Sequence, residues 1–283
     1  MLKKTFLITG FCLVSTSCLL IHISHANNLP ELKFEQTCPD SNGYAPEFVY
    51  EDFNSSYLQE LRTRFNLNDI VKDCTSEYDK ILAVTNWVHH LWEHNGDKEP
   101  VKYDPISILQ EVFEHKKQFR CVEYSIVLTG CLNALGLRSR ILRLRTADVE
   151  TREYGAGHVV TEAYLPSLSK WIMIDCQANS VPVLNELPLN AVEFQHALAT
   201  KQPGLDIATQ ATNLTFKEYV NFIGQYLYYF QTALEPNSTY NNQQASIMLV
   251  PIGAPKPRIF QKTSSLNVSV YTNSVGCFYQ KPN

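Results

Sequence analysis

The chain has 283 residues, of which 45% are hydrophobic, 18% charged and 11% aromatic. This composition is typical of a globular protein and excludes a disordered chain. The length is sufficient for one large domain or for a core domain with an extension. The formal net charge is −4, and the sequence lacks runs of basic and aromatic residues, so no nucleic-acid partner is expected.

The first 26 residues have the pattern of an export signal. Two lysines, Lys3 and Lys4, precede an apolar stretch from Phe6 to Ile23, and Ser24-His25-Ala26 supplies small residues for cleavage. The alternative is a membrane anchor that stays attached, but polar residues interrupt the apolar stretch. Cleavage would remove two basic and no acidic residues and would leave a net charge of −6. The short basic start is typical of bacterial signals and predicts a secreted or periplasmic protein without a stable membrane span.

After residues 1–26, the sequence predicts an N-terminal wrap over 27–75, a core over 76–200 and a C-terminal extension over 201–283 that packs on the core. Pro, Asn, Asp and Ser are frequent over 27–56, which favours irregular structure there. Apolar residues at helical spacing predict a helix within Ser76–His94. Asp104-Pro105 predicts the start of a second helix that reaches about His115, because Asp caps helices and Pro favours the first helical position.

A buried helix is predicted from Cys121 to Leu137, ending near Gly136. Three strands are expected next, at 139–144, 158–165 and 170–176. Beyond Gln177, helical patterns recur at 190–199 and 215–234, and short strand-like segments follow.

A short link, Pro166-Ser167-Leu168-Ser169, connects the second and third strands and has the length of a hairpin loop. If it closes a hairpin, Leu165 faces Lys170 and Val160 faces Asp175. His158 and Asp175 then point to the same side of the sheet as diagonal neighbours, roughly 7–8 Å apart between Cα atoms, within reach of a hydrogen bond.

Cys121 is the candidate nucleophile, because a cysteine in the first turn of a helix lies near unsatisfied N–H groups that favour the thiolate. Cys131 lies ten residues further along the same helix and is interpreted as a small core residue. The alternative for Cys121 is a buried structural thiol. The histidine and the aspartate downstream favour a thiol nucleophile with His158 as its base and Asp175 as the residue that orients the histidine.

Three blocks in this order resemble the transglutaminase-like superfamily, and the resemblance covers about Ser76 to Gln177. The blocks are Phe119-Arg120-Cys121-Val122-Glu123-Tyr124-Ser125 through Leu135-Gly136-Leu137-Arg138-Ser139-Arg140, then Gly157-His158-Val159-Val160-Thr161-Glu162-Ala163-Tyr164, then Lys170-Trp171-Ile172-Met173-Ile174-Asp175. The resemblance implies an α+β, papain-like fold in which a nucleophile helix packs on an antiparallel sheet, here with a helical and short-strand C-terminal extension.

By position, the resemblance implies that Cys121 is the nucleophile, His158 the base and acid, and Asp175 the orienting residue. It implies cleavage or transfer of amide-linked acyl groups through a thioester, with a protein, peptide or glycopeptide amide as substrate. Gln118 is the candidate side-chain donor of the oxyanion hole, with the N–H of Cys121; the alternative for Gln118 is a surface amide. No metal or cofactor is predicted.

This sequence departs from the family pattern at Phe119, Val160 and Cys176, where the family often has glycine, tryptophan and proline. The alternative function is therefore a non-catalytic binding or scaffold protein that retains the fold.

Three further patterns have two interpretations each. His89, His90 and His94 with Glu93 are interpreted as a surface histidine cluster on a helix rather than a zinc site. Arg138, Arg140, Arg143 and Arg145 are interpreted as a solvated edge strand rather than a basic rim for an anionic substrate. The aromatic residues at helical spacing over 216–230 favour core packing over a ligand platform. Cys38 and Cys74 are a possible disulfide pair.

Overall fold

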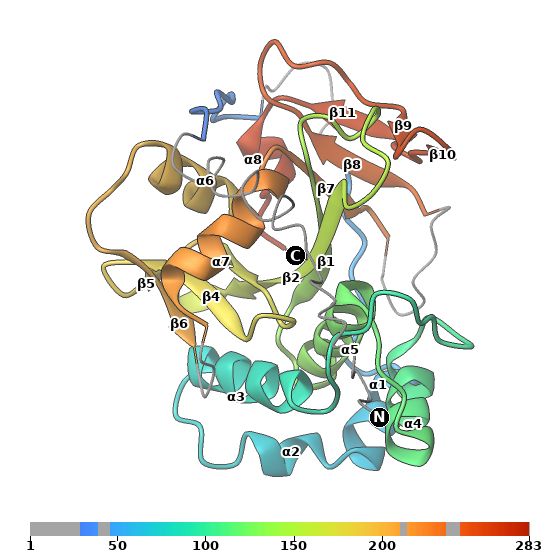
Figure 1. The fold of residues 1–283 in the computed structure, drawn as a ribbon. Coiled ribbons are helices and arrows are strands. Elements are labelled where there is room, and N and C mark those ends of the chain that lie inside the picture. Colours follow the sequence, from blue (N-terminus) through green and yellow to red (C-terminus); the bar gives the residue numbers. More distant parts are fainter. Residues whose placement is uncertain (1–28, 39–45, 210–213, 236–243, 283) are drawn as a thin grey trace, which may run out of the picture.

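The computed structural model describes residues 29–38, 46–209, 214–235 and 244–282. The predicted export signal, residues 1–26, lies outside the described residues. Within them, helices and strands form a mixed α+β fold around one large sheet (Figure 1). None of the helices in these ranges is long and apolar enough to cross a membrane.

The main sheet has six strands in the order β11-β8-β7-β1-β2-β3. Neighbouring strands are antiparallel except for β11 and β8, which are parallel. Their bounds are β1 Ser139–Arg145, β2 Gly157–Leu165, β3 Lys170–Ile174, β7 Tyr229–Ala233, β8 Ser246–Leu249 and β11 Val270–Thr272. Segments on both sides of residue 200 thus contribute to one sheet, and the proposed division of the chain at that residue stays a prediction.

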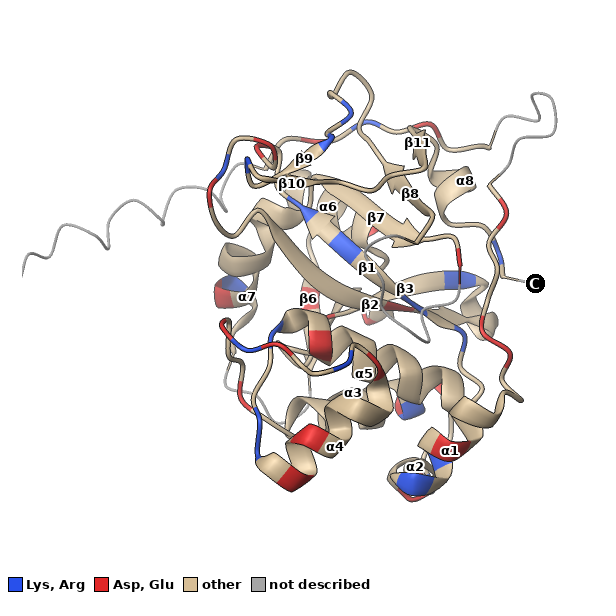
Figure 2. Cartoon of the chain, turned by 90° about the vertical axis from the view of Figure 1, so that its right-hand side faces the viewer, with Lys and Arg blue, Asp and Glu red and all other residues tan. Residues whose placement is uncertain are grey.

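Helices cover both faces of this sheet, because alternate residues of its strands are apolar on opposite faces (Figures 1 and 2). Ile141, Val159 and Ile172 face the first layer, and Leu142, Val160 and Met173 face the second. The first layer comprises α1 (Ser56–Arg64), α2 (Leu67–Ile70), α3 (Glu77–His89), α4 (Pro105–His115) and α5 (Cys121–Ala134), and the second α6 (Ala191–Ala199), α7 (Phe216–Ile223) and α8 (Val275–Phe278).

Two smaller sheets lie outside the main one. One has the order β5-β4-β6, formed by Leu187–Pro188, Ser180–Leu184 and Leu205–Thr209, and the other pairs β9 (Ile259–Phe260) with β10 (Ser264–Ser265). The asparagine-rich turns around β4 and β5 have left-handed residues at Asn179, Asn185 and Glu186, which reverse the chain there.

The central helix α5 is buried on nearly all sides, as predicted. It ends near Gly136, which has a φ of +78° and allows Leu137 N–H to donate to Leu132 O at 2.9 Å. Small residues let the neighbours approach closely. A Cβ on Gly130 would lie 2.3 Å from Cγ of Pro105, the first residue of α4.

The predicted helix over 215–234 is wrong in its second half. Thr215 caps α7 as its side chain accepts from Glu218 N–H, but the helix ends at Ile223 and a short 3-10 turn leads into strand β7. The helical spacing of apolar residues continues past this point, yet β7 pairs with β1 and β8 instead. Partners that are distant in the sequence therefore override the local periodicity.

The edge-strand interpretation of the arginine-rich segment is also wrong. Strand β1 lies in the interior of the sheet, between β7 and β2 (Figure 2). Its three arginines are buried. Arg140 forms an ion pair with Glu162 at 2.8 Å, and its guanidinium lies 4.3 Å from the ring centre of Trp171. The paired charge of Arg140 is thus part of the interior.

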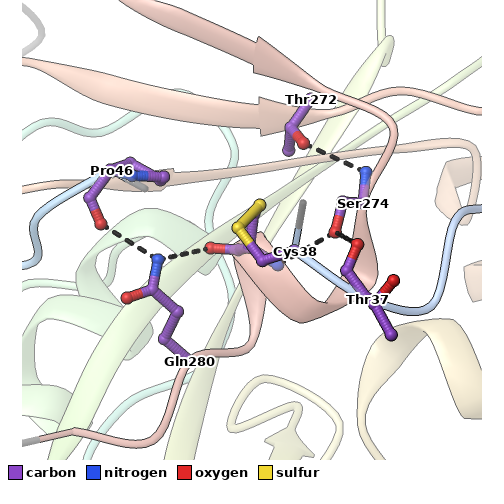
Figure 3. Close-up of a disulfide and its surroundings, with 7 residues drawn as sticks. Thr37, Cys38, Pro46, Thr272, Ser274 and Gln280 are labelled. Carbon is purple, nitrogen blue, oxygen red and sulfur yellow. Dashed lines mark hydrogen bonds between the residues drawn. A yellow bond between two sulfur atoms is a disulfide. The ribbon is translucent and has the colours of Figure 1, made fainter. Parts of the chain in front are cut away.

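The disulfide pairing suggested for Cys38 and Cys74 is wrong as well. Cys38 is bonded to Cys277 (Figure 3), whereas Cys74 is a half-buried free thiol. The segment before Cys38 runs beside the start of α8, where Val275 N–H donates to Glu35 O and the Ser274 hydroxyl donates to Thr37 O. Tertiary pairing therefore joins two cysteines that are 239 residues apart in the sequence.

Candidate active site

Cys121 is the first residue of α5, as predicted, and its side chain is half-buried. The helix start is stabilised by Glu123, which is fully buried and accepts from Arg120 N–H at 3.0 Å. The Arg120 guanidinium forms an ion pair with the same carboxylate and a second one with Glu99. This capping arrangement fixes the backbone that carries the thiol.

Polar contacts hold the first two turns of α5 against strand β2. The Ser125 hydroxyl lies 2.9 Å from both Cys121 O and Val159 O, so it connects the nucleophile turn to the strand that carries His158. One helical turn further on, the hydroxyls of Thr129 and Thr161 lie 3.2 Å apart. The position of Cys121 along β2 is thereby set by side-chain hydrogen bonds in the interior.

The hairpin register predicted from the short link is confirmed. Leu165 faces Lys170 and Thr161 faces Ile174, so His158 and Asp175 lie on one side of the sheet. His158 Nε2 and Asp175 Oδ2 are 2.9 Å apart, and the two side chains are only 3% and 0% exposed. The expected hydrogen bond between them is therefore present.

Asp175 is held by two further hydrogen bonds. The Tyr219 hydroxyl from α7 donates to its Oδ2 at 3.3 Å, and Ala178 N–H donates to its Oδ1 at 3.2 Å. The turn after Asp175 closes by backbone bonds in both directions between Asp175 and Ser180. These contacts supply the donors that a buried carboxylate requires.

His158 lies between Asp175 and the thiol of Cys121. Burial alone would lower the pKa of His158. The negative charge of Asp175 and the hydrogen bonds to Asp175 and Cys121 outweigh burial and raise this pKa to about 10. Because Nε2 bonds to Asp175, Nδ1 is the nitrogen that is available to the sulfur. The three side chains predicted from the sequence thus converge at one place.

Aromatic residues from the segment after residue 215 enclose this histidine. The ring of Phe222 packs edge-on at 5.0 Å between ring centres, and the ring of Tyr226 lies at 5.7 Å. The charge of Cys121 contributes to the raised pKa of Tyr226, after burial. The helical spacing of these residues predicted core packing. It gave no signal that their rings lie over His158.

Gln118 occupies the loop between α4 and α5 and is half-buried. It lines a hollow of about 620 Å³ together with Tyr124, Gln177 and the histidines at 89, 90 and 94. Its role as an oxyanion donor stays a prediction.

The histidine cluster is split by the end of α3 at His89, so that His94 lies beyond the helix. Desolvation and the nearby charge of His158 lower the pKa of His94. Within the described ranges, no group of three or more His, Cys, Asp or Glu side chains could hold a metal ion.

Residues 66–176 match the family model described as the transglutaminase-like superfamily. This segment contains Cys121, His158 and Asp175, and the match confirms the resemblance to that superfamily over these residues. The predicted fold class, a papain-like and transglutaminase-like α+β core with the cysteine helix on an antiparallel sheet, is therefore confirmed. A comparison with curated proteins found no match.

Three solved structures are similar to the chain at low TM-scores. One from Cytophaga hutchinsonii, provisionally named a cysteine protease, is 16% identical with a TM-score of 0.35, and the match covers 62% of this chain and 55% of that one. One named a TGase is 18% identical with a TM-score of 0.31, covering 42% of this chain and 31% of that one. One from Parabacteroides distasonis, provisionally named a protease, is 13% identical with a TM-score of 0.29, covering 43% and 29%. The chain spans about half or less of the length of these structures.

Proposed function

We propose that the protein is an exported thiol enzyme that cleaves or transfers amide-linked acyl groups through a thioester on Cys121. The observation that supports this proposal most directly is the position of His158, which contacts the thiol on one side and Asp175, at 2.9 Å, on the other. Nucleophile, base and orienting carboxylate in this order are the arrangement that thiol acyl transfer requires.

In the proposed reaction, the Cys121 thiolate attacks the carbonyl carbon of a peptide or glycopeptide amide. The N–H of Cys121, at the open start of α5, and the Gln118 amide donate to the developing oxyanion. Protonated His158 gives its proton to the leaving nitrogen, the C–N bond breaks, and a thioester remains on Cys121. Water or an amine then attacks the thioester while neutral His158 accepts the proton, and Asp175 keeps the ring oriented throughout.

Two features support export. The first 26 residues have the composition of a signal peptide, and the Cys38–Cys277 disulfide fits an extracellular protein, because disulfides form and persist in oxidising compartments.

The test is alkylation with iodoacetamide at about pH 6, where an ordinary thiol with a pKa of roughly 8.5 is almost entirely protonated. Cys74 is a matched internal control because it is also a half-buried free cysteine. We expect Cys121 to react on the order of 10–100-fold faster than Cys74, as an activated thiolate does. Peptide mapping by mass spectrometry measures both sites in one sample.

His158→Ala should reduce the rate at Cys121 to about that of Cys74, and Cys121→Ser should abolish thioester trapping from a peptide library without unfolding the protein. Equal rates at Cys121 and Cys74 in the unmodified protein would contradict the proposal and favour a non-catalytic binding or scaffold protein.

A further inference from the structure

The face of the sheet that carries α5 continues beyond the start of that helix. Ile141 of β1 packs under the helix layer, and the alternation of side chains places Arg143 and Arg145 on the same face, further along the strand. Arg143 lies opposite Val159 and Arg145 opposite Gly157 in β2. The two arginines therefore lie on the face of the sheet that carries α5 and Cys121.

A pocket of about 650 Å³ lies over this part of the sheet. Cys121 and Val122 from α5 line it on one side, Arg143 and Arg145 line it from β1, and Gln231 and Ser246 line it from β7 and β8. The candidate nucleophile and two arginines of an interior strand thus share one cavity, of a size that accommodates a small ligand or one or two residues of a peptide.

Arg145 is held in a defined position. Its Nη2 donates to Gln231 Oε1 at 3.2 Å, and its guanidinium carbon lies 4.5 Å from the ring centre of Phe260. A Cβ on Gly157 would lie 2.7 Å from Arg145 Nη1, so the absence of a side chain at this position makes room for the guanidinium. Because Gly157 and Arg145 line the same pocket as Cys121, this cation is fixed on the side of the sheet that carries the thiol.

The described residues that line the pocket include three arginines and one acidic residue, Glu99. Arg120, at the rim, forms ion pairs with Glu99 and Glu123. Arg143 and Arg145 are 6% and 9% exposed, and guanidinium groups in such partly desolvated places bind carboxylates through charge-assisted, often bidentate, hydrogen bonds. The charge of the lining is therefore complementary to an anion.

We infer that this pocket is the subsite for a carboxylate next to the scissile amide, so that the preferred substrate is a peptide with an acidic residue or a free carboxyl group at that place. The inference rests on the proposed function of Cys121. It assigns Arg143 and Arg145 as specificity residues that bind the substrate carboxylate.

Two alkylating reagents that differ only in charge test this inference. Iodoacetate carries a carboxylate where iodoacetamide carries a neutral amide, and both transfer their CH₂ group to sulfur with loss of iodide. The ratio of the two rates at Cys121, divided by the same ratio at Cys74, cancels differences in thiolate fraction and in reagent reactivity. We expect this double ratio to favour iodoacetate at Cys121 by about tenfold, as a charge-assisted hydrogen bond would produce.

Arg145→Gln and Arg143→Gln should each lower the double ratio several-fold, whereas Arg145→Lys should retain part of it. Arg64→Gln is the matched control, because Arg64 is an exposed arginine on α1 that pairs with Glu60. If a glutamine variant fails to fold, the unmodified protein still provides the test, since a double ratio near one there contradicts the inference by itself.

The failure of this inference can be distinguished from the failure of the proposed function. Fast, His158-dependent labelling by iodoacetamide with a double ratio near one overturns the carboxylate subsite and leaves the enzyme intact. Labelling of Cys121 no faster than Cys74 by either reagent overturns both. Thioester trapping with matched peptides provides the substrate-level test, in which a peptide with Glu beside the scissile amide should form more adduct than its Gln counterpart; equal amounts would contradict the inference.

Discussion

His158 and Asp175 form a buried pair whose charges are stable only together. A lone imidazolium or carboxylate at these positions would lose its hydration without compensation, whereas the pair shares one hydrogen bond and Asp175 gains two more from Tyr219 and Ala178. Loss of one partner therefore leaves a buried charge or an unsatisfied hydrogen-bond donor. Asp175, which is proposed to orient the base, thus also contributes to the stability of the protein.

The raised pKa of His158 predicts how stability depends on pH. In the unfolded chain the histidine pKa is about 6.5, while in the folded protein it is about 10. The folded state therefore binds this proton more tightly, and its contribution to stability is complete below about pH 6.5 and is lost as pH rises through 10. Asp175→Asn removes the charge that raises the pKa. We expect the difference in unfolding free energy between the two proteins to be largest near pH 6 and to shrink toward pH 10.

Denaturant unfolding of both proteins at several pH values measures this difference. The contributions of the other titrating groups are the same in both proteins and cancel. A difference that is the same at about pH 6 and pH 10 would show that the His158–Asp175 pair is not protonated in the folded protein.

Helix α5 is buried on nearly all sides, and its packing determines where Cys121 lies. The helix is confined between α4 on one side and β2 on the other, with Gly130 against Pro105 and Ser125 against Val159 O. A displacement of the helix along its axis would move the thiol relative to His158. The packing of this element is therefore a requirement for the geometry of the candidate site.

Gly130→Ala tests this requirement. A Cβ at this position would lie 2.3 Å from Pro105 Cγ and 3.3 Å from Leu61 Cδ2, so α4 or α5 must shift. Overpacking of this kind costs about 1–3 kcal/mol. We expect a lower free energy of unfolding and slower alkylation of Cys121, both measurable on the same preparation.

Gly96→Ala is the matched control, since an added Cβ there would meet only His94 Cε1, at 4.0 Å. It should leave the free energy of unfolding nearly unchanged. An equal effect of the two substitutions would show that the loss of glycine, rather than contact with Pro105, is responsible.

At the scale of the whole molecule, the two ends of the described chain are joined. The Cys38–Cys277 disulfide joins residues that are 239 positions apart (Figure 3). A Cβ on Gly276 would lie 2.7 Å from both Cys38 N and Gln36 O. The Gln280 side chain reinforces this contact by donating to Pro46 O and Cys277 O. The N-terminal segment is thereby attached to the helix that closes the second layer.

Removal of the disulfide by the double substitution Cys38→Ser and Cys277→Ser should lower the free energy of unfolding by about 2–5 kcal/mol, because the long loop then gains conformational entropy in the unfolded state. Thermal unfolding with and without reductant measures the effect. Cys74→Ser is the control, and reductant should not affect the double variant. An unchanged melting temperature in the double variant would contradict this role of the disulfide.

Local patterns in the sequence were sufficient for the start of α5 at Cys121, for the Asp104-Pro105 start of α4 and for the register that sets His158 beside Asp175. Each depends on interactions between residues that are near one another in the chain. A capping residue acts within one turn, and a short link between strands fixes which residues face each other, because side chains alternate along a strand.

Tertiary structure alone decided the other features. The helical pattern over 215–234 ends in strand β7, β1 lies inside the sheet despite its arginines, and Cys38 pairs with Cys277 instead of Cys74. Each depends on partners outside the local segment: β7 on β1 and β8, the arginines on Glu162, Gln231 and aromatic rings, and Cys38 on α8. Contacts at such separations are selected by the packing of the whole chain, which no local pattern encodes.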